Sequence, residues 1–467
     1  MTTTLVREQL AALFLDSCKA ATAKLTDAGV SLAFSRPRTH VVRSGENHDW
    51  ETQRRWAEGN ILRLRGKMIE PAAPLLGNEL VHNADGCAAG LLALEGNTLL
   101  LNPTFFPPGG WPLTRLVQGD EAAVRDEEPV RWVREVVLLP ALLEHMQALP
   151  QVDQAEPQHA KWFSNEVVRV ATTETASYRV SVPLSGIDIQ TLDGAPLQWE
   201  NVTIRYLSDL EQGAHFDEVG TRPRSLMALF NAPPLVVLEC IEKYPRNEQM
   251  PLTLSRRVRS MMAALQLYGF ELAGHSAKIE SVPKWLSFGA GLPHLGLPGT
   301  PPNWRVLTPE VFVGVAATAR CLERWNIDQP KSTHDLALHR FCSGVARTND
   351  TDAVLDFTIA LESLLLPYDA NARHSELSYR FRLHGAYYLT DEPSQRQEMS
   401  KTLNALYTMR SRLVHGGKYP TAEEIRATRQ SARELAQRGL MQAVHGGFPT
   451  AGSFTRMALG LDGDADE

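Results

Sequence analysis

The chain has 467 residues, of which 43% are hydrophobic, and its 47 basic and 54 acidic side chains give a net charge of −7. This length and apolar content predict two or three domains with substantial cores, and the acidic balance does not indicate a general nucleic-acid-binding protein. The sequence shows neither an apolar run of about 18 residues nor a secretory signal core, so we expect a cytoplasmic protein without a membrane partner.

The N-terminal part combines helical and β-type patterns. Residues 5–26 predict one or two helical segments, and β-rich runs follow at residues 98–101, 178–182 and 202–207. Residues 128–149 fit a strand or a helix equally well. We therefore expect residues 1–300 to form a mixed α+β or β-rich region, which can comprise two subdomains.

Two further segments of this region are distinctive, one for its basic residues and one for its Gly and Pro content. Residues 255–268 predict a helix that begins with Arg256, Arg257 and Arg259, which we interpret as a scaffold helix with a solvated basic edge. Residues 288–302 are rich in Gly and Pro, and we predict a linker without regular structure there. No Gly-Lys-Ser/Thr follows these glycines, so the pattern does not indicate an ATP site.

Cysteine usage argues against disulfides and against a zinc site. The five cysteines are scattered, odd in number and without Cys-x-x-Cys spacing: Cys18, Cys87, Cys240, Cys321 and Cys342. We expect no metal and no cofactor.

Charged side chains interrupt two apolar helical faces in the C-terminal part. In residues 354–366, Glu362 projects on the wide apolar side, whereas Asp356 and Ser363 occupy the narrow polar side. In residues 403–417, Arg410 falls within the apolar stripe and Arg412 on the opposite side. The stripe consists of Leu403, Leu406, Tyr407, Leu413 and Val414.

An isolated buried charge is costly, so an inward Arg410 and an inward Glu362 predict a pair. The pair is either a structural salt bridge that positions two helices or part of a site. The helix then ends at His415, with the C-cap signal Gly416-Gly417 behind it, which leaves the histidine at the rim of the helices.

The order of these segments carries a family resemblance. Residues 337–341, 352–367 and 376–382, followed by the run from Arg410 to His415, resemble the HEPN domain of ApeA-like prokaryotic defence proteins. The resemblance covers residues 309–444, and it implies an all-α HEPN helical bundle over residues 305–447. It also implies a homodimer or larger even oligomer, in which both copies of the motif face one groove.

The activity that the resemblance implies is metal-independent RNA cleavage, in which the 2′-hydroxyl attacks the adjacent phosphorus. Such an enzyme needs a proton acceptor, a cation for the phosphorane charge and a proton for the leaving oxygen. The imidazole of His415 suits the acid/base role, and the planar fork of Arg410 suits the phosphate. Glu362 would orient Arg410 or assist proton transfer.

Two positions depart from the pattern of the wider superfamily. Many catalytic members carry Asn, Asp or His directly after the arginine, where this chain has Ser411. Toxin-pair members carry a tyrosine two residues after the histidine, where this chain has Gly417, which disfavours that version. The alternative from another class is a non-catalytic binding or scaffold protein that keeps the arginine and glutamate for structure.

The charge of one C-terminal segment favours an RNA partner more than the net charge of the whole chain does. Residues 371–420 carry eight Lys/Arg against four acids, a net of +4, which also fits ordinary solvated helix faces. Within this segment we predict substrate-binding roles for Arg380, Arg412 and Lys418. His384 lies on an apolar stripe and is interpreted as a core histidine.

The complete hypothesis is an endoribonuclease of antiphage, abortive-infection defence that cuts host RNA, with tRNA as a candidate substrate. The N-terminal region would sense a phage-derived trigger or restrain the nuclease. The capping box at residues 421–424 predicts a final helix, and residues 448–467 predict a frayed acidic tail.

Overall fold

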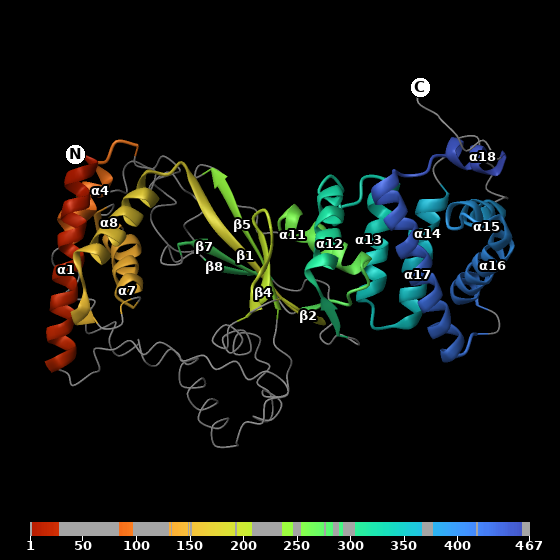
Figure 1. Ribbon diagram of the computed structural model, residues 1–467, viewed down its shortest axis with the longest axis horizontal. Coiled ribbons are helices and arrows are strands. Elements are labelled where there is room, and N and C mark those ends of the chain that lie inside the picture. The colour runs from red at the N-terminus through yellow and green to blue at the C-terminus, as the bar shows by residue number, and fades with distance from the viewer. Residues whose placement is uncertain are drawn as a thin grey trace, which may run out of the picture.

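The helices and strands follow one another along the long axis of the molecule (Figure 1). The computed structural model describes residues 2–27, 84–96, 130–131, 133–147, 149, 152–191, 194–207, 236–245, 254–274, 277–283, 289–292, 304–366, 377–416 and 419–459. Helices at the N-terminal end are followed by a β-sheet and then by a helical region. The predicted mixed α+β composition with a C-terminal helical region is confirmed.

Within the described residues of the N-terminal region, four α-helices form a cluster. They are α1 (Thr3–Asp27), α4 (Ala84–Leu92), α7 (Leu139–Gln147) and α8 (Pro157–Thr172), with a π-helix (Val133–Leu138) before α7 and a 3-10 turn (Val152–Gln154) before α8. Phe14 of α1 stacks on Phe163 of α8 with ring centroids 5.3 Å apart. The first predicted helix is therefore a single one, and the described part of residues 128–149 is helical.

A seven-stranded sheet follows, with the order β3-β4-β5-β1-β7-β8 and with β6 also paired to β1. Its strands are β1 (Thr175–Ser185), β3 (Leu197–Trp199), β4 (Val202–Tyr206), β5 (Val236–Pro245), β6 (Ala273–Gly274), β7 (Ala277–Val282) and β8 (Gly289–Leu292). All neighbouring pairs are antiparallel. In β1, Tyr178, Val180 and Val182 are buried, which is the alternation that a half-buried strand requires.

The sheet corrects one sequence-based expectation and leaves another outside the described residues. Gly289–Leu292 is strand β8, paired with β7, although its Gly-rich sequence predicted no regular structure. Backbone hydrogen bonds to a preformed neighbour fix this strand, so side-chain propensity does not decide it. The β-rich run at residues 98–101 lies outside the described residues.

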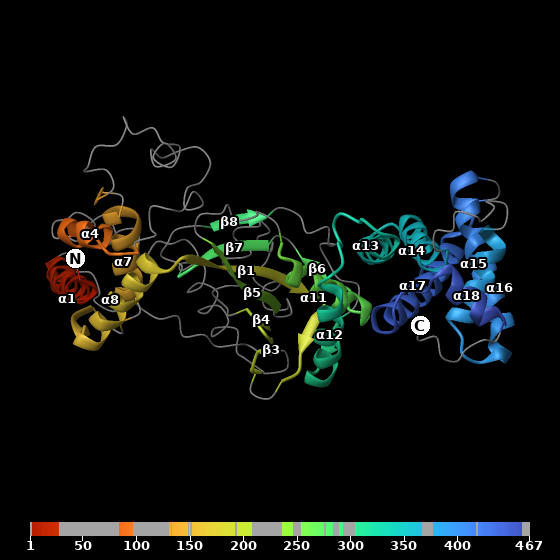
Figure 2. The same ribbon diagram turned by 90° about the horizontal axis from the view of Figure 1, so that it is seen from above.

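The sheet connects to the C-terminal helices through α11 (Arg256–Leu267) and a short parallel pair. Ser255 caps α11 by accepting a hydrogen bond from the Val258 N–H. Strand β2 (Ile187–Ile189) pairs with β9 (Arg305–Leu307), which leads directly into the next helix. Figure 2 shows α11 and α12 side by side between the sheet and the remaining helices.

The C-terminal helical region contains α12 (Pro309–Leu322), α13 (Thr333–Ala346), α14 (Asp350–Leu365), α15 (Leu377–Tyr388), α16 (Pro393–His415), α17 (Ala422–Gly446) and α18 (Ala451–Leu459). The predicted capping box is present at the start of α17, where Thr421 and Glu424 exchange hydrogen bonds. Across the described ranges, no helix combines the length and the hydropathy that a membrane span requires.

Helix α18 corrects the prediction that the tail from residue 448 is frayed. Residues 451–459 form this helix, and Phe454 is 2% exposed. Its ring stacks on His384 of α15 with centroids 4.1 Å apart. Phe454 therefore anchors a segment whose composition alone indicated disorder. Residues 460–467 lie outside the described part of the chain.

Candidate functional site

The sequence of α16 explains both its length and its abrupt end. Pro393 occupies the first turn, where its missing N–H costs no helical hydrogen bond. Leu403, Leu406 and Met409 are buried at intervals of three residues and hold the helix against its neighbours. The helix ends at Gly416, whose φ of 81° is one that other residues rarely adopt.

The structure brings Arg410 and Glu362 together, as predicted. Arg410 Nε of α16 lies 3.5 Å from Glu362 Oε1 of α14, and the two side chains are 30% and 21% exposed. This separation is long for a hydrogen bond, so the contact is an ion pair. Because both groups keep contact with solvent, the pair lies at the margin of the core.

Burial, rather than the arginine, dominates the protonation of Glu362. Desolvation raises the pKa of its carboxyl group above the ordinary value of 4.5, and the charge of Arg410 only partly opposes this. In an ion pair whose Coulombic attraction outweighs the desolvation, the pKa of the carboxyl group would be lowered instead. Glu362 is thus closer than an ordinary glutamate to exchanging a proton under mild conditions.

His415 occupies the last turn of α16 and is exposed to solvent. The Gly416 N–H closes the helix on the Arg412 carbonyl at 3.2 Å, so the chain turns away directly behind the imidazole. Arg410 and His415 belong to one continuous helix and point about 140° apart around its axis. The two side chains therefore do not converge within one protomer.

Arg412, which was predicted on the side of α16 opposite the apolar stripe, contacts a neighbouring helix. Its Nη2 lies 3.6 Å from Glu424 Oε2 at the start of α17, and its side chain is as exposed as that of Arg410, at 30%. The same Glu424 oxygen accepts the Thr421 N–H at 2.8 Å. We interpret Arg412 as a brace between the end of α16 and the capping box of α17.

The apolar stripe of α16 also differs from the prediction at its end. Val414, which was assigned to the core, is 51% exposed, and Tyr419 beyond the helix is 62% exposed. Met409, which the predicted stripe did not include, is buried. The last turn of α16 is not covered by the neighbouring helices. The apolar Val414 and the catalytic candidate His415 are therefore both exposed at this helix end.

The other predicted positions have different environments. Arg380 lies half-buried on α15 close to His384, and Lys418 lies outside the described residues. His384 is a core histidine, as predicted: its Nδ1 lies 2.6 Å from the Leu365 carbonyl oxygen. Burial, with the charge of Arg380 as a smaller contribution, lowers the pKa of His384.

A second charged cluster was missed because Asp356 was assigned to the solvent side of α14. Asp356 is 3% exposed, and its two oxygens each lie 2.9 Å from an arginine, Arg340 Nη1 and Arg347 Nε. Hydrogen bonding to Asp356 raises the pKa of Arg347. Arg340 lies in the middle of α13 and Arg347 directly after its end, with an extended backbone, so helical spacing alone does not reveal that both reach Asp356.

No protein-family model, curated protein or solved structure matches this chain.

Proposed function

We propose that this protein is a metal-independent endoribonuclease of the HEPN type, with Arg410, His415 and Glu362 as its catalytic residues. The observation that supports the proposal best is the Arg410–Glu362 pair: it lies at the core margin, and burial raises the pKa of its carboxyl group. Perturbed ionisable groups at accessible positions are typical of catalytic sites. The resemblance of residues 309–444 to ApeA-like HEPN domains adds the substrate class and a role in antiphage defence.

The chemistry uses no group beyond the chain and its RNA. A base removes the proton of the 2′-hydroxyl, the oxygen bonds to the adjacent phosphorus, and the bond from phosphorus to the 5′-oxygen breaks as that oxygen takes up a proton. The products are a 2′,3′-cyclic phosphate and a 5′-hydroxyl. Arg410 neutralises the phosphorane oxygens, and His415 transfers the protons.

The site requires two copies of the chain. Arg410 and His415 diverge around one helix, so a second protomer must contribute to the same groove. The exposed apolar side chain of Val414, next to His415 on α16, favours a contact between copies at this helix end. A homodimer or larger even oligomer is therefore part of the proposal.

The N-terminal region restrains the nuclease or triggers it. Contacts of the segment between α11 and β6 provide a physical connection for this role: Glu271 of this segment pairs with Arg433 of α17, and both side chains are about 15% exposed. Arg305 of β9 donates a hydrogen bond to the Tyr268 carbonyl at 3.0 Å. A change in the sheet can reach the helices through these bonds.

The decisive experiment compares RNA cleavage by the wild type and by Arg410→Ala and Arg410→Lys, with a small-RNA pool in EDTA. We expect Arg410→Ala to lower cleavage by about a hundredfold to a thousandfold, because a preformed cation for the developing charge is lost. Arg410→Lys should restore only part of the activity, since a lysine lacks the planar fork. Cleavage by the wild type should leave 2′,3′-cyclic phosphate ends.

Arg412→Ala is the matched control, because Arg412 lies two residues away on the same helix with the same exposure and its guanidinium is held by Glu424. Its effect should be much the smaller of the two. Equal losses for Arg410→Ala and Arg412→Ala would contradict the proposed role of Arg410. If the wild type cleaves no RNA with or without phage lysate, and the folded variants are equally inactive, the result would favour the scaffold alternative.

The pKa of Glu362 predicts an unusual pH dependence for Glu362→Gln. Because the folded protein binds the proton of Glu362 more tightly than the unfolded chain, the wild type loses stability relative to the Gln variant as the pH rises above about 4.5. The Gln variant should therefore be at least as stable as the wild type at pH 7.5. Thermal unfolding of both proteins at pH 4.5 and 7.5 measures this difference, and a less stable Gln variant at pH 7.5 would identify a structural salt bridge.

A further inference from the structure

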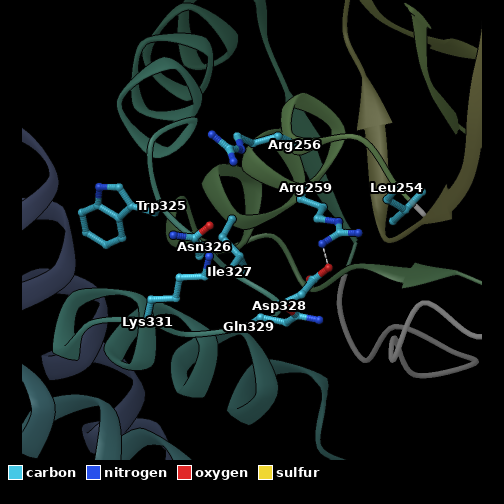
Figure 3. A pocket seen from close by; sticks show the side chains of 9 residues that line it. All are labelled: Leu254, Arg256, Arg259, Trp325, Asn326, Ile327, Asp328, Gln329 and Lys331. Atoms are coloured by element: carbon cyan, nitrogen blue, oxygen red, sulfur yellow. Dashed lines mark ion pairs between the residues drawn. The ribbon is translucent and has the colours of Figure 1, made fainter. Parts of the chain in front are cut away.

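A cavity of about 350 Å³ lies between the start of α11 and the connection from α12 to α13 (Figure 3). Arg256 and Arg259 come from α11 on one side, and the segment from Trp325 to Lys331 forms the other. The volume is at the lower end of the range for small-molecule sites, about 300–1,000 Å³. The cavity has no place in the proposed nuclease site, none of whose residues line it.

The connection that lines the cavity is held in one conformation by buried groups. The carboxylate of Asp335, a residue that is 5% exposed, accepts the backbone N–H of Asn326 at 2.9 Å and that of Lys331 at 3.0 Å. His339 Nδ1 lies 2.8 Å from the Ile327 carbonyl oxygen. The wall is therefore formed before a ligand arrives, which lowers the entropic cost of binding.

The charge of the cavity is positive. Three cations line it, against the single carboxylate of Asp328, which pairs with Arg259. Among the described residues, neither the Arg256 guanidinium nor the Lys331 ammonium has an ion-pair partner, and both side chains belong to exposed residues. Burial lowers the pKa of Arg259, so a second anion beside it would relieve an unfavourable desolvation.

Neutral groups complete the lining. Trp325 contributes only an edge, because the residue is 8% exposed and its ring packs against Phe448. The amide groups of Asn326 and Gln329 offer both donors and acceptors. A neighbouring hollow shares Trp325 and Lys331 and adds Arg324, an exposed residue that likewise has no ion-pair partner among the described residues. Cations beside an aromatic edge and amides suit a ligand that combines phosphate groups with a polar ring.

We propose that this cavity binds a small phosphate-bearing ligand. Arg256, Arg259 and Lys331 hold the phosphate groups, and the amides of Asn326 and Gln329 contact the rest of the ligand. The site uses cationic side chains in place of a glycine-rich phosphate loop, so no such motif marks it in the sequence. This proposal does not rest on the proposed nuclease function.

The position of the cavity gives the ligand a structural consequence. Helix α11 contacts the sheet through β5 and the helical region through α12, α13 and α17. A ligand bound to Arg256 on one wall and Lys331 on the other bridges these two parts of the chain. Ligand binding to the folded state alone should therefore raise the thermal unfolding temperature.

The test is calorimetric titration of the full-length protein with ATP, GTP, CTP and UTP separately, with inorganic triphosphate, and with adenosine. Binding of the phosphate-bearing ligands and not of adenosine is expected, with an affinity that falls as salt is raised. Nucleotides that bind more tightly than triphosphate identify a nucleotide as the ligand. Equal affinities identify the phosphate groups alone as the ligand's recognised part.

Variants locate the binding in this cavity. Arg256→Ala and Lys331→Ala should each weaken binding by about tenfold or more, which is the effect of losing one charged hydrogen bond. Arg7→Ala also removes one positive charge, from an exposed position on the N-terminal helix α1 that does not line the cavity. This variant should bind the ligand with unchanged affinity. No binding of any phosphate-bearing probe at millimolar concentration, or equal loss in all three folded variants, would overturn the proposal.

Discussion

Replacing His415 by alanine should lower RNA cleavage by about a hundredfold to ten-thousandfold, the usual effect of removing a general acid or base. This corresponds to roughly 3 to 5 kcal/mol of transition-state stabilisation. The fold should not change, because His415 is exposed in the last turn of α16 and Gly416 supplies the C-cap. Initial cleavage rates in EDTA, with circular dichroism of each variant, measure both quantities.

His445→Ala is the matched control for this substitution. His445 also lies in the last turn of a helix, α17, ahead of a glycine with positive φ, and it contacts Thr318 Oγ1 at 3.1 Å. His445→Ala should lower the stability of the protein more than it lowers the rate of RNA cleavage. If His415→Ala cleaves RNA as fast as the wild type, the assignment of His415 to acid/base chemistry is wrong, whatever Arg410 does.

Helical periodicity found the Arg410–Glu362 pair because a charge within an apolar stripe has few physical solutions. Burial of either group alone would cost several kcal/mol, so the two stripes had to face one another. The same reasoning identified the end of α16 from Gly416 and the start of α17 from Thr421 and Glu424. In each of these places the local sequence specifies a local geometry.

The same periodicity failed at Asp356 because the side of α14 that carries this residue meets α13. This helix contacts α13, α15, α16 and α17, so its narrow polar side meets another helix and is buried there. The sequence of one helix does not reveal how many neighbours surround it. Val414 shows the opposite case, in which an apolar position extends beyond its neighbours and stays exposed.

The cavity beside α11 was missed for a related reason. Arg256 and Arg259 were assigned to a solvated basic edge, and the sequence does not show that the α12–α13 connection lies opposite them. Their spacing on a helix is the same whether they face bulk water or a cavity. Only the tertiary arrangement, which places Lys331 across from Arg256, distinguishes the two cases.

Neutralising the two carboxylates of α14 that pair with arginines should change stability in opposite directions: Asp356→Ala should destabilise the protein, whereas Glu362→Gln should not. The effect of Asp356→Ala should be the larger one. We expect it to cost about 2 to 3 kcal/mol in the helical region, somewhat less than the loss of a fully buried pair. The reason is that the side chain of Asp356 is 4% exposed, whereas those of Arg340 and Arg347 are 37% and 48% exposed and can regain water. Hydrogen exchange of the α13 and α14 amides measures this local opening free energy.

Asp352→Ala provides the comparison, since Asp352 is an exposed carboxylate one turn earlier on the same helix, where it interacts with the helix dipole and, as a minor contribution, with the charge of Arg347. If Asp356→Ala destabilises α13 and α14 no more than Asp352→Ala does, the buried arginine cluster does not anchor these helices. If the cost appears at Asp356 while Glu362→Gln is neutral at pH 7.5, the fold depends on the first carboxylate and not on the second. Glu362 and Arg410 would then lie together at the edge of the core for a reason other than stability, which is what a catalytic pair requires.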